Sequence, residues 1–592
     1  MTSNITQMEK LNEPFSKDSD FSQLNENKTN KKKIIIIVAG VTLIIIAIII
    51  IIAVVVRRSN SGNSGTSDKS DSSGESTDPS NLDYEIKHIN FHNVYYLGSH
   101  YNHQGEIFLI YEKIKDGDKV YFGIGNENGE ILKEIIVANK NDFRHKDYIH
   151  RVSSFSDGKR AFVGGKILEC TKKFIECDDP KFYDIQFPEE ILNFEDLYYL
   201  FSEPIINYDN KYIFWSTFDH DMNTMNFFGE LEFDENKKKY VIKNTKGISN
   251  FFFDKFDNIS GTFSMPKMIR NGPIKQLVND GEGVNIGGFY DYGIRKGIFQ
   301  SLEEDKLTKL SSFDGYEETI SISPDKKLAC VMSTRFSKHT NFEMVGLVPA
   351  PYSVIVTYWF SYHLMLNSIG AIRKRDNVVA NIGPALVDLE KSKNEKDYLG
   401  YNLSQDSKWI FNGFLSWYPD GKKIMFDEIH KTGIRRCTIV ALKNYKPGKI
   451  DHSYQFKGNC PYSRSIKETL NLHLDYPKNI EVKGKSGSLT IFADKNKKEI
   501  NYFNFSEDNE IYYNGTYSFN GYKDSGQEYY ILRVKINVTG KKKGNCDYRF
   551  WFDKAKLMQF DLAEDGKNKS FGSCEYDGKK FNAEDYKYEL IE

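Results

Sequence analysis

The chain has 592 residues, and its 80 basic and 82 acidic side chains give a formal net charge of −2. This balance argues against a nucleic-acid partner, which would require a basic face, so we expect none. Aromatic residues make up 14% of the chain, but Asn, Lys and Ile are also abundant, so the aromatic share does not by itself indicate a sugar-binding surface.

The N-terminal part of the chain has the pattern of a membrane anchor. Residues 1–33 are polar and lack hydrophobic periodicity, which predicts a disordered cytoplasmic tail. Residues 34–56 are apolar throughout, with no charge and no proline. As a helix this run would be about 35 Å long, enough to cross a hydrocarbon core of about 30 Å. It is too long and starts too late for a cleaved signal peptide, so we predict an uncleaved signal-anchor helix in the lipid bilayer.

Charges and cysteines predict the orientation of this helix. Lys28 and Lys31–Lys33 outweigh Arg57, Arg58 and Lys69, which keeps the N-terminus in the cytoplasm. All seven cysteines follow the helix, as do six N-x-S/T triplets, which favours an oxidising, glycosylating compartment. We therefore predict a single-pass type II glycoprotein of the plasma membrane or Golgi, with an extracellular or lumenal C-terminal part. The six triplets begin at Asn258, Asn402, Asn504, Asn514, Asn537 and Asn568, and two others, at Asn4 and Asn27, precede the helix.

A flexible stalk and then a long β-rich region follow the helix. Residues 57–81 are rich in Ser, Gly and Asp, as in a flexible linker. From residue 82 onward, short alternating apolar runs are separated by Gly, Asn and Asp, which predicts strands joined by turns.

One turn unit recurs along residues 82–470. Its clearest copies read Ser-Asp-Gly-Lys at Asp157, Ser-Pro-Asp-Lys-Lys at Asp325 and Tyr-Pro-Asp-Gly-Lys-Lys at Asp420, with looser copies at Asp209 and Asp406. Pro presets φ, Asp caps its own backbone and Gly tolerates positive φ, so each copy predicts a tight turn before a strand. The copies at Asp157 and Asp209 lie 52 residues apart, and those at Asp325 and Asp420 lie 95 apart, about two units of 47. A period of about 40–50 residues suits a four-stranded propeller blade.

This repeat resembles the blade signature of the TolB-type, WD40-like β-propellers. The resemblance spans roughly residues 84–465, and its cleanest copy is Asp420-Gly421-Lys422-Lys423. It implies a mostly β fold with an extracytoplasmic propeller of about six or seven blades over residues 82–470, and it says little about function.

Three segments are similar to a narrower group, the fungal saponin hydrolase-like proteins. They are residues 155–170, 227–233 and 322–335. Those proteins are secreted propellers, and characterised members cleave a glycosidic bond of a plant saponin. This chain differs from them in its membrane anchor and its additional C-terminal region, and no matched motif assigns a catalytic residue.

Residues 336–400 interrupt the blade rhythm. Long insertions between propeller blades often carry binding residues, although packing across a blade junction is the somewhat more common explanation of such a segment. We include Arg335, Arg373 and Arg375 as candidate ligand-binding residues on this basis.

The C-terminal residues 471–592 form a second β region. Alternating strands with turns about every ten residues predict a β-sandwich, with hairpin turns at Asn514-Gly515 and Asn520-Gly521. Cys546 and Cys574 are expected to pair within it. In the propeller, Cys170 with Cys177 and Cys437 with Cys460 are the plausible pairs, which leaves Cys330 free.

Several catalytic motifs are absent from the sequence. There is no G-x-S-x-G of an α/β-hydrolase, no H-E-x-x-H, no zinc-type pair of C-x-x-C motifs and no phosphate-binding glycine loop. We therefore expect no cofactor and no metal site.

Glycoside cleavage usually requires two carboxylates and can use an aromatic ring beneath the sugar. The catalytic candidates are the acids that follow two predicted strands: Asp219, Asp221, Asp427 and Glu428. The candidate ligand-binding residues beside them are His220, Trp215, Trp417 and His430. For each of these, a solvated loop charge or a blade-core aromatic is the alternative interpretation, and it is the more common case.

Two classes of function fit this sequence. The first is a membrane-anchored propeller that binds a glycan or a protein, and the second is a membrane-anchored glycoside hydrolase that acts on a glycoside. We favour the binding module because no catalytic constellation is visible, and whether the chain is an enzyme stays open at this point.

Overall fold

All residues described by the computed structural model belong to one compact unit, Ser76–Glu592. The described ranges are 78–139, 152–219, 224–249, 272–289, 295–313, 317–336, 383–404, 406, 408–411, 415–430, 434–450, 454–471, 479–493, 497–506, 508–524, 527–553, 571–576 and 578–582. The predicted tail (1–33), transmembrane helix (34–56) and most of the stalk (57–81) lie outside them. Among the described residues, no helix has both the length and the apolar character needed to cross a membrane.

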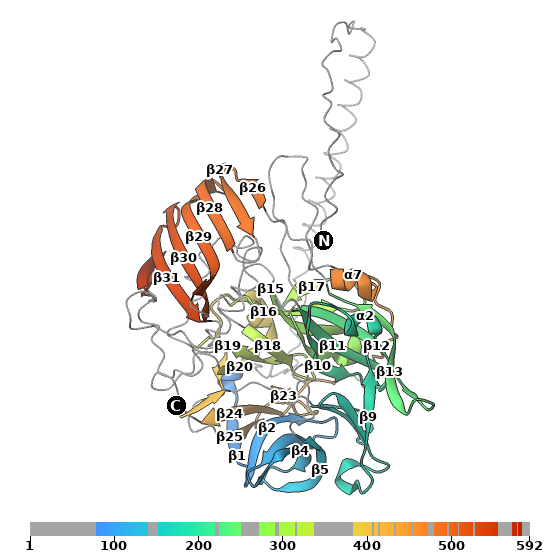
Figure 1. Ribbon diagram of the computed structural model, residues 1–592. Helices are drawn as coiled ribbons and strands as arrows, with labels where there is room; N and C mark the ends of the chain where they lie inside the picture. Colours follow the sequence, from blue (N-terminus) through green and yellow to red (C-terminus); the bar gives the residue numbers. More distant parts are fainter. Residues whose placement is uncertain are drawn as a thin grey trace, which may run out of the picture. The chain divides into compact units, whose positions relative to one another are not determined.

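Strands dominate these residues, which confirms the predicted mostly β class (Figure 1). Those of the propeller form antiparallel blades of four or five strands, and the second and third blades join into one sheet through a short parallel pairing of their last strands. The first blade consists of β2 (Val94–Tyr101), β3 (Ile107–Lys113), β4 (Asp116–Gly125) and β5 (Ile131–Asn139). The second consists of β6 (Val152–Ser154), β7 (Arg160–Val163), β8 (Lys166–Glu169) and β9 (Lys181–Gln186). The third consists of β10 (Leu197–Ile206), β11 (Tyr212–Asp219), β12 (Thr224–Asp234) and β13 (Lys239–Gly247).

The fourth and fifth blades repeat the same order. The fourth consists of β14 (Ile274–Val278), β15 (Gly283–Phe289), β16 (Arg295–Ser301) and β17 (Leu307–Lys309). The fifth consists of β18 (Glu317–Ile322), β19 (Leu328–Ser333), β20 (Gly383–Asp388) and β21 (Tyr401–Asn402). The short helix α6 (Leu389–Asn394) connects β20 to β21. Since β19 pairs directly with β20, the predicted insertion emerges within a blade rather than between two blades.

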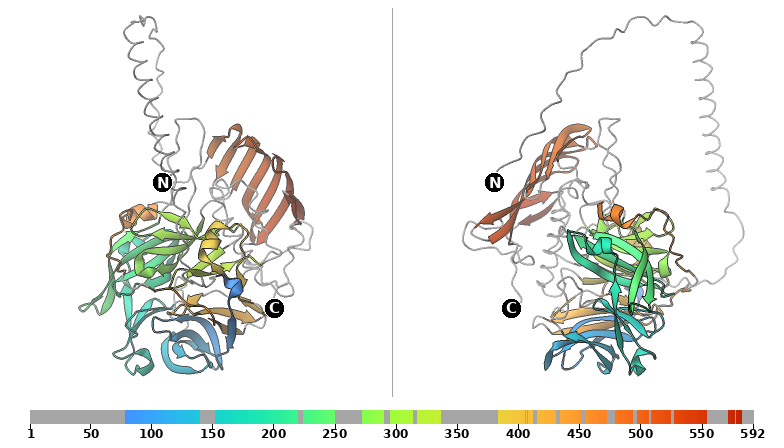
Figure 2. Two further views of the ribbon diagram at one scale, coloured as in Figure 1. Left: turned by 180° about the vertical axis from the view of Figure 1, so that it is seen from behind. Right: turned by 45° about the vertical axis from the view of Figure 1, so that its right-hand side comes forward.

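The sixth blade combines strands from both ends of the propeller. It contains β22 (Trp409–Phe411), β23 (Ser416–Trp417), β24 (Lys423–His430), β25 (Arg435–Leu442) and, as its outer strand, β1 (Tyr84–Ile89). β1 runs antiparallel to β25, from Tyr84 opposite Leu442 to Ile89 opposite Cys437. Figures 1 and 2 show this blue N-terminal strand beside the orange strands of the sixth blade. The N-terminal strand therefore closes the ring of blades.

Hydrophobic packing follows the same ring. Each cluster of buried side chains joins two successive blades, such as Phe108 with Leu168 between the first and second, and Leu386 with Phe426 between the fifth and sixth. The cluster of Tyr111 and Met425 joins the sixth blade back to the first. Burial of each such side chain contributes about 1.5–3 kcal/mol, so the blade interfaces hold the ring together.

The C-terminal strands form a single sheet, so the predicted β-sandwich is wrong for the described residues. Each strand is antiparallel to its successor in the chain, as Figure 1 shows for β26 to β31. Apolar residues alternate with polar ones both in one sheet of a sandwich and in a single antiparallel sheet. The sequence pattern therefore does not distinguish the two folds, which explains the error. The strands are β26 (Asn479–Lys483), β27 (Ser486–Ala493), β28 (Lys497–Ser506), β29 (Ile511–Asp524), β30 (Gln527–Gly540), β31 (Gly544–Asp553), β32 (Phe571–Tyr576) and β33 (Lys579–Asn582).

The two Asn-Gly dipeptides predicted as hairpin turns lie inside strand β29 instead. Gly515 has φ of 128°, and a Cβ atom there would come within 2.0 Å of the Lys535 carbonyl oxygen on the neighbouring strand. Glycine is therefore needed at this position for close approach of two strands, and the dipeptide signal for a turn is misleading.

Two of the three expected disulfides are present. Cys170 pairs with Cys177, and Cys546 on β31 pairs with Cys574, which lies directly opposite it on β32. Cys330 is free, as predicted, and its side chain is buried. The expected pair of Cys437 and Cys460 is wrong, because both thiols are free and lie in different hydrophobic clusters.

Candidate functional site

Six equivalent turns surround one end of the propeller axis, each joining the innermost strand of a blade to its second strand. Four of them are the predicted turns at Asp157, Asp209, Asp325 and Asp420, and the sequence analysis missed two, at residues 102–106 and 279–282. The looser copy at Asp406 lies between β21 and β22, so it is not one of these turns. Every one of the six contains a residue with positive φ: Gly105, Gly158, Asn210, Asp280, Lys326 and Gly421.

Neighbouring turns contact one another around the ring. Gln104 Nε2 donates to the Ser156 carbonyl oxygen at 2.7 Å, and the Ser156 amide donates to Asn210 Oδ1 at 2.8 Å. The Tyr208 amide donates to the Asp280 carboxylate, which links the third blade to the fourth. The repeated turn in the sequence thus builds a continuous rim.

The rim encloses a cavity of about 390 Å³ on the propeller axis. The innermost strands of all six blades, β2, β6, β10, β14, β18 and β23, contribute to its wall. Its lining combines apolar side chains such as Leu277 with polar ones such as Ser153, His103 and Lys275. A concave site of this size with a few polar groups is typical of a small-molecule pocket.

Trp417, a predicted ligand-binding residue, lines this cavity. Its indole Nε1 donates to the Ser321 carbonyl oxygen of β18 at 2.8 Å, which fixes the ring across the junction of the fifth and sixth blades. The neighbouring Ser416 hydroxyl accepts from the Tyr101 amide of β2 at 3.1 Å. Trp417 is therefore fixed in the cavity wall, with 8% of its surface exposed and the rest packed in the hydrophobic cluster between the fifth and sixth blades.

Asp280 is the one carboxylate among the described residues that line the cavity. Its half-buried side chain projects from the rim turn of the fourth blade, where its own φ is 56°. Burial raises the pKa of Asp280 to about 6, and the nearby charge of Asp209 adds to this rise, while the bond from the Tyr208 amide opposes it. A cleft carboxyl that titrates near neutral pH is a marker of functional sites.

The predicted acids Asp427 and Glu428 are buried and do not form a pair of carboxylates. They are consecutive in β24, so their side chains point to opposite faces of the blade. Asp427 accepts from the hydroxyl of Ser99 at 2.7 Å and from its amide at 3.2 Å. Ser99 itself lines the cavity, so Asp427 supports the cavity wall from behind.

Glu428 belongs to a separate polar network within the sixth blade. It accepts from Ser404 Oγ at 2.9 Å, from Thr438 Oγ1 at 2.7 Å and from the Arg436 guanidinium at 2.8 Å. Arg436 also lies over the Trp409 ring, 4.1 Å from its centroid. Predicted residue His430 contacts the same Trp409 ring at 5.2 Å, away from the cavity lining. These contacts indicate a structural role for this network.

Arg335, predicted to bind ligand, forms a buried ion pair with Glu317 at 2.8 Å. Its guanidinium also donates to the hydroxyls of Ser311 at 2.8 Å and Ser392 at 3.0 Å. Trp215 is fully buried and stacks on Phe227 in the core of the third blade, so its ring presents no face to a ligand. Both side chains are buried in the protein interior and are not available to a ligand.

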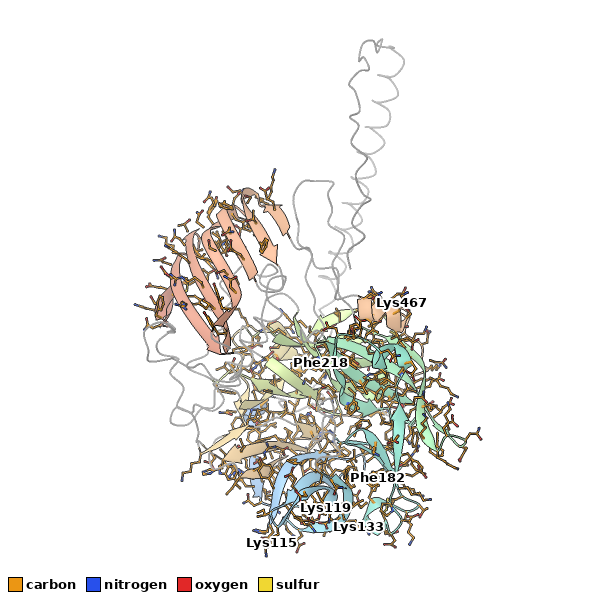
Figure 3. The ribbon with its side chains drawn as sticks, viewed as in Figure 1. Lys115, Lys119, Lys133, Phe182, Phe218 and Lys467 are labelled. Atoms are coloured by element: carbon orange, nitrogen blue, oxygen red, sulfur yellow. A yellow bond between two sulfur atoms is a disulfide. The ribbon has the colours of Figure 1, made fainter. Side chains whose placement is uncertain are left out.

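The remaining predicted residues cannot be placed in the site. The backbone of Asp219 ends β11, one residue after the buried Phe218 labelled in Figure 3. His220, Asp221, Arg373 and Arg375 lie outside the described residues. In the described part of the chain, no group of three His, Cys, Asp or Glu side chains could hold a metal ion.

The sequence contained a signal for Asp280 that the motif search passed over. Asn279-Asp280-Gly281 stands 45 residues before Asp325, one repeat period, but it lacks the Ser-Pro and Lys-Lys flanks of the other copies. A search for turn residues at the repeat spacing, without requiring the flanking residues, would have identified this turn.

Replacing Asp280 with Asn is expected to stabilise the fold in a pH-dependent way. The folded state raises the pKa of Asp280, so the contribution of this side chain to the free energy of unfolding is greatest below about pH 4 and declines as the pH rises through about 6. Asn keeps the acceptor for the Tyr208 amide and carries no charge. We expect Asp280→Asn to gain on the order of 1 kcal/mol at pH 7, after allowance for solvent screening, and nothing at pH 4. Urea unfolding at both pH values measures this difference, and an equal effect at the two pH values would contradict it.

Comparison with known proteins gives structural neighbours only. No family model matches the chain, and no curated protein matches it. The resemblance to saponin hydrolase-like proteins therefore stays a prediction without support.

Solved structures similar to the chain include two TolB proteins. A putative TolB from Agrobacterium tumefaciens has 11% identity and a TM-score of 0.27, over 50% of this chain and 74% of its own. TolB from Acinetobacter baumannii has 11% identity and a TM-score of 0.26, over 62% of this chain and 65% of its own. An oligogalacturonate lyase from Vibrio parahaemolyticus has 8% identity and a TM-score of 0.34, over 62% of this chain and 100% of its own. The assignment of a β-propeller rests on the pairing of its strands, described above.

Proposed function

We propose that the chain is a single-pass type II membrane protein whose extracytoplasmic propeller binds a sugar residue of a glycan in its axial cavity. The observation that carries this proposal is the cavity itself, whose lining includes the aromatic residue Trp417, 8% exposed, and the half-buried carboxylic acid Asp280. An aromatic face can pack on the apolar face of a sugar ring, and a carboxylate accepts hydrogen bonds from its hydroxyls.

The lining of the cavity favours binding over glycoside cleavage. Hydrolysis by the usual route requires a second carboxylate about 5–10 Å from the first, and Asp280 is the one carboxylate among the described lining residues. The specific observation in favour of an enzyme is the pKa of Asp280, about 6, which would suit a general acid. A glycoside hydrolase is therefore the second candidate function.

The membrane part of the proposal is supported by residues 34–56 and by the two disulfides. Both disulfides lie C-terminal to this apolar run, as expected for a domain that folds in an oxidising compartment. The plasma membrane and the Golgi both provide such a compartment on the far side of a type II anchor.

A glycan panel tests the binding function. The full chain in mild detergent is incubated with plant glycosides and neutral oligosaccharides, and mass spectrometry measures both retained ligand and released sugar. We expect retention of an intact ligand without release. Release that is lost in Asp280→Asn would favour the hydrolase, and neither retention nor release would contradict sugar binding and leave a protein ligand as the alternative.

A further inference from the structure

The C-terminal sheet carries two arginines directly opposite each other on neighbouring strands. Arg533 on β30 faces Arg549 on β31, and Phe571 on β32 lies opposite Arg549. These three residues occupy the sheet face opposite to Leu532 and Val534, which are fully buried. They therefore form a short row across three strands on the polar face of the sheet.

The ring of Phe571 holds both guanidinium groups in place. The central carbon of Arg533 lies 5.6 Å from the ring centroid and that of Arg549 lies 5.9 Å from it. Phe571 is nevertheless 42% exposed, and the Arg533 side chain is 35% exposed. The arrangement fixes two cations side by side and leaves the row accessible to solvent.

One carboxylate is too little to balance this pair of charges. Arg533 forms an ion pair with Asp547, and like charges directly opposite on adjacent strands destabilise a sheet. Between residues 533 and 549 there are six basic side chains and one acidic side chain. Two guanidinium groups held side by side against one ring in a locally basic strand pair are suited to a planar oxyanion.

Aromatic side chains on the same face of the sheet indicate which kind of molecule carries the bound oxyanion. Tyr522 and Tyr529 lie opposite each other on β29 and β30, with their rings stacked at 5.4 Å. Tyr529 precedes Arg533 by four residues, so both lie on one face of β30, and Tyr522 is 43% exposed. An exposed aromatic pair beside two arginines combines a stacking surface for a sugar ring with donors for its acidic group.

We propose that the row of Arg533, Arg549 and Phe571 binds the carboxylate or sulfate of an acidic glycan. This site does not depend on sugar binding in the propeller cavity, and it gives the C-terminal sheet a recognition role of its own. The carboxylate of a uronic acid and a sulfate ester have the same oxyanion chemistry, so the experiment must separate them.

The test is a titration of the full chain in mild detergent with three oligosaccharides of equal length. One is a uronate oligomer, one is a heparin-derived sulfated oligomer, and one is neutral dextran. We expect binding of the uronate or the sulfated oligomer, and the stronger of the two identifies the oxyanion. Arg533→Gln and Arg549→Gln are each expected to weaken it by roughly 10- to 100-fold. Equal binding of dextran would overturn the proposal, as would no binding of either acidic oligomer.

Two further variants separate a geometric site from general charge attraction. Lys541→Gln removes one charge from the tip of the same hairpin, where Lys541 is 70% exposed, and is expected to change affinity less than twofold. Arg549→Lys retains the positive charge but loses the planar guanidinium group, so it is expected to lose most of the affinity. The same variant replaces Arg549→Gln in the test if Arg549→Gln fails to fold. Equal losses in Lys541→Gln and Arg549→Gln, or full affinity in Arg549→Lys, would overturn the proposal.

Discussion

Removal of strand β1 is expected to abolish folding of the propeller, whereas removal of the preceding residues is not. β1 supplies the outer strand of the sixth blade through six consecutive register positions. The segment also buries Leu82 and Ile89 and stacks Tyr84 on Tyr401 at 4.1 Å. Two buried aliphatic side chains contribute about 1.5–3 kcal/mol each, and the exposed edge of β25 adds to the loss. The sum is comparable to the total stability of a typical domain, about 5–15 kcal/mol.

Thermal unfolding followed by circular dichroism measures this effect on chains lacking residues 1–75 and residues 1–89. The first should unfold cooperatively, and the second should show no cooperative transition or aggregate on expression. Equal transition temperatures for the two chains would contradict closure of the ring by β1.

Replacing Arg335 with Met is expected to destabilise the propeller by about 3–5 kcal/mol, because it leaves the Glu317 carboxylate buried without its countercharge. Both side chains are almost completely buried, and Glu317 Oε2 has no other partner among the described residues. Arg335 is therefore part of the fifth blade's interior rather than the ligand contact that its position beside the insertion suggested.

A double variant provides the control for this prediction. Arg335→Met with Glu317→Leu removes both charges, so most of the lost stability should return in urea unfolding. Lys243→Met breaks an exposed pair with Glu232 and should leave the free energy of unfolding almost unchanged. If the double variant is no more stable than Arg335→Met alone, the uncompensated carboxylate is not the cause.

Local features of the fold could be predicted from the sequence. The turn at Asp420 is encoded within a few residues, since its carboxylate accepts from the Lys422 amide at 2.8 Å and Gly421 supplies the positive φ. The disulfide of Cys170 with Cys177 closes a separation of only seven residues. Such short-range signals predicted the blades and their repeat.

Long-range pairings could not be predicted in the same way. Tyr84 and Leu442 are opposite each other on paired strands although the whole propeller separates them in sequence. The partner of Asp427 is Ser99, 328 residues away, so a plausible catalytic acid is a support for the cavity wall. No local pattern specifies which strand closes a ring or which face of a strand meets a neighbouring blade.

The most direct test of the central claim is a titration of the ligand retained in the glycan panel against three forms of the full chain. These are the wild type, Asp280→Asn and Asp420→Asn. Asp420 lies in the equivalent turn of the sixth blade, but it does not line the cavity, so Asp420→Asn is the matched control. If the axial cavity is the binding site, loss of a charged acceptor should weaken affinity by roughly 10- to 100-fold in Asp280→Asn, and Asp420→Asn should stay within twofold of the wild type. Wild-type affinity in Asp280→Asn, or equal losses in both variants, would contradict binding in the cavity.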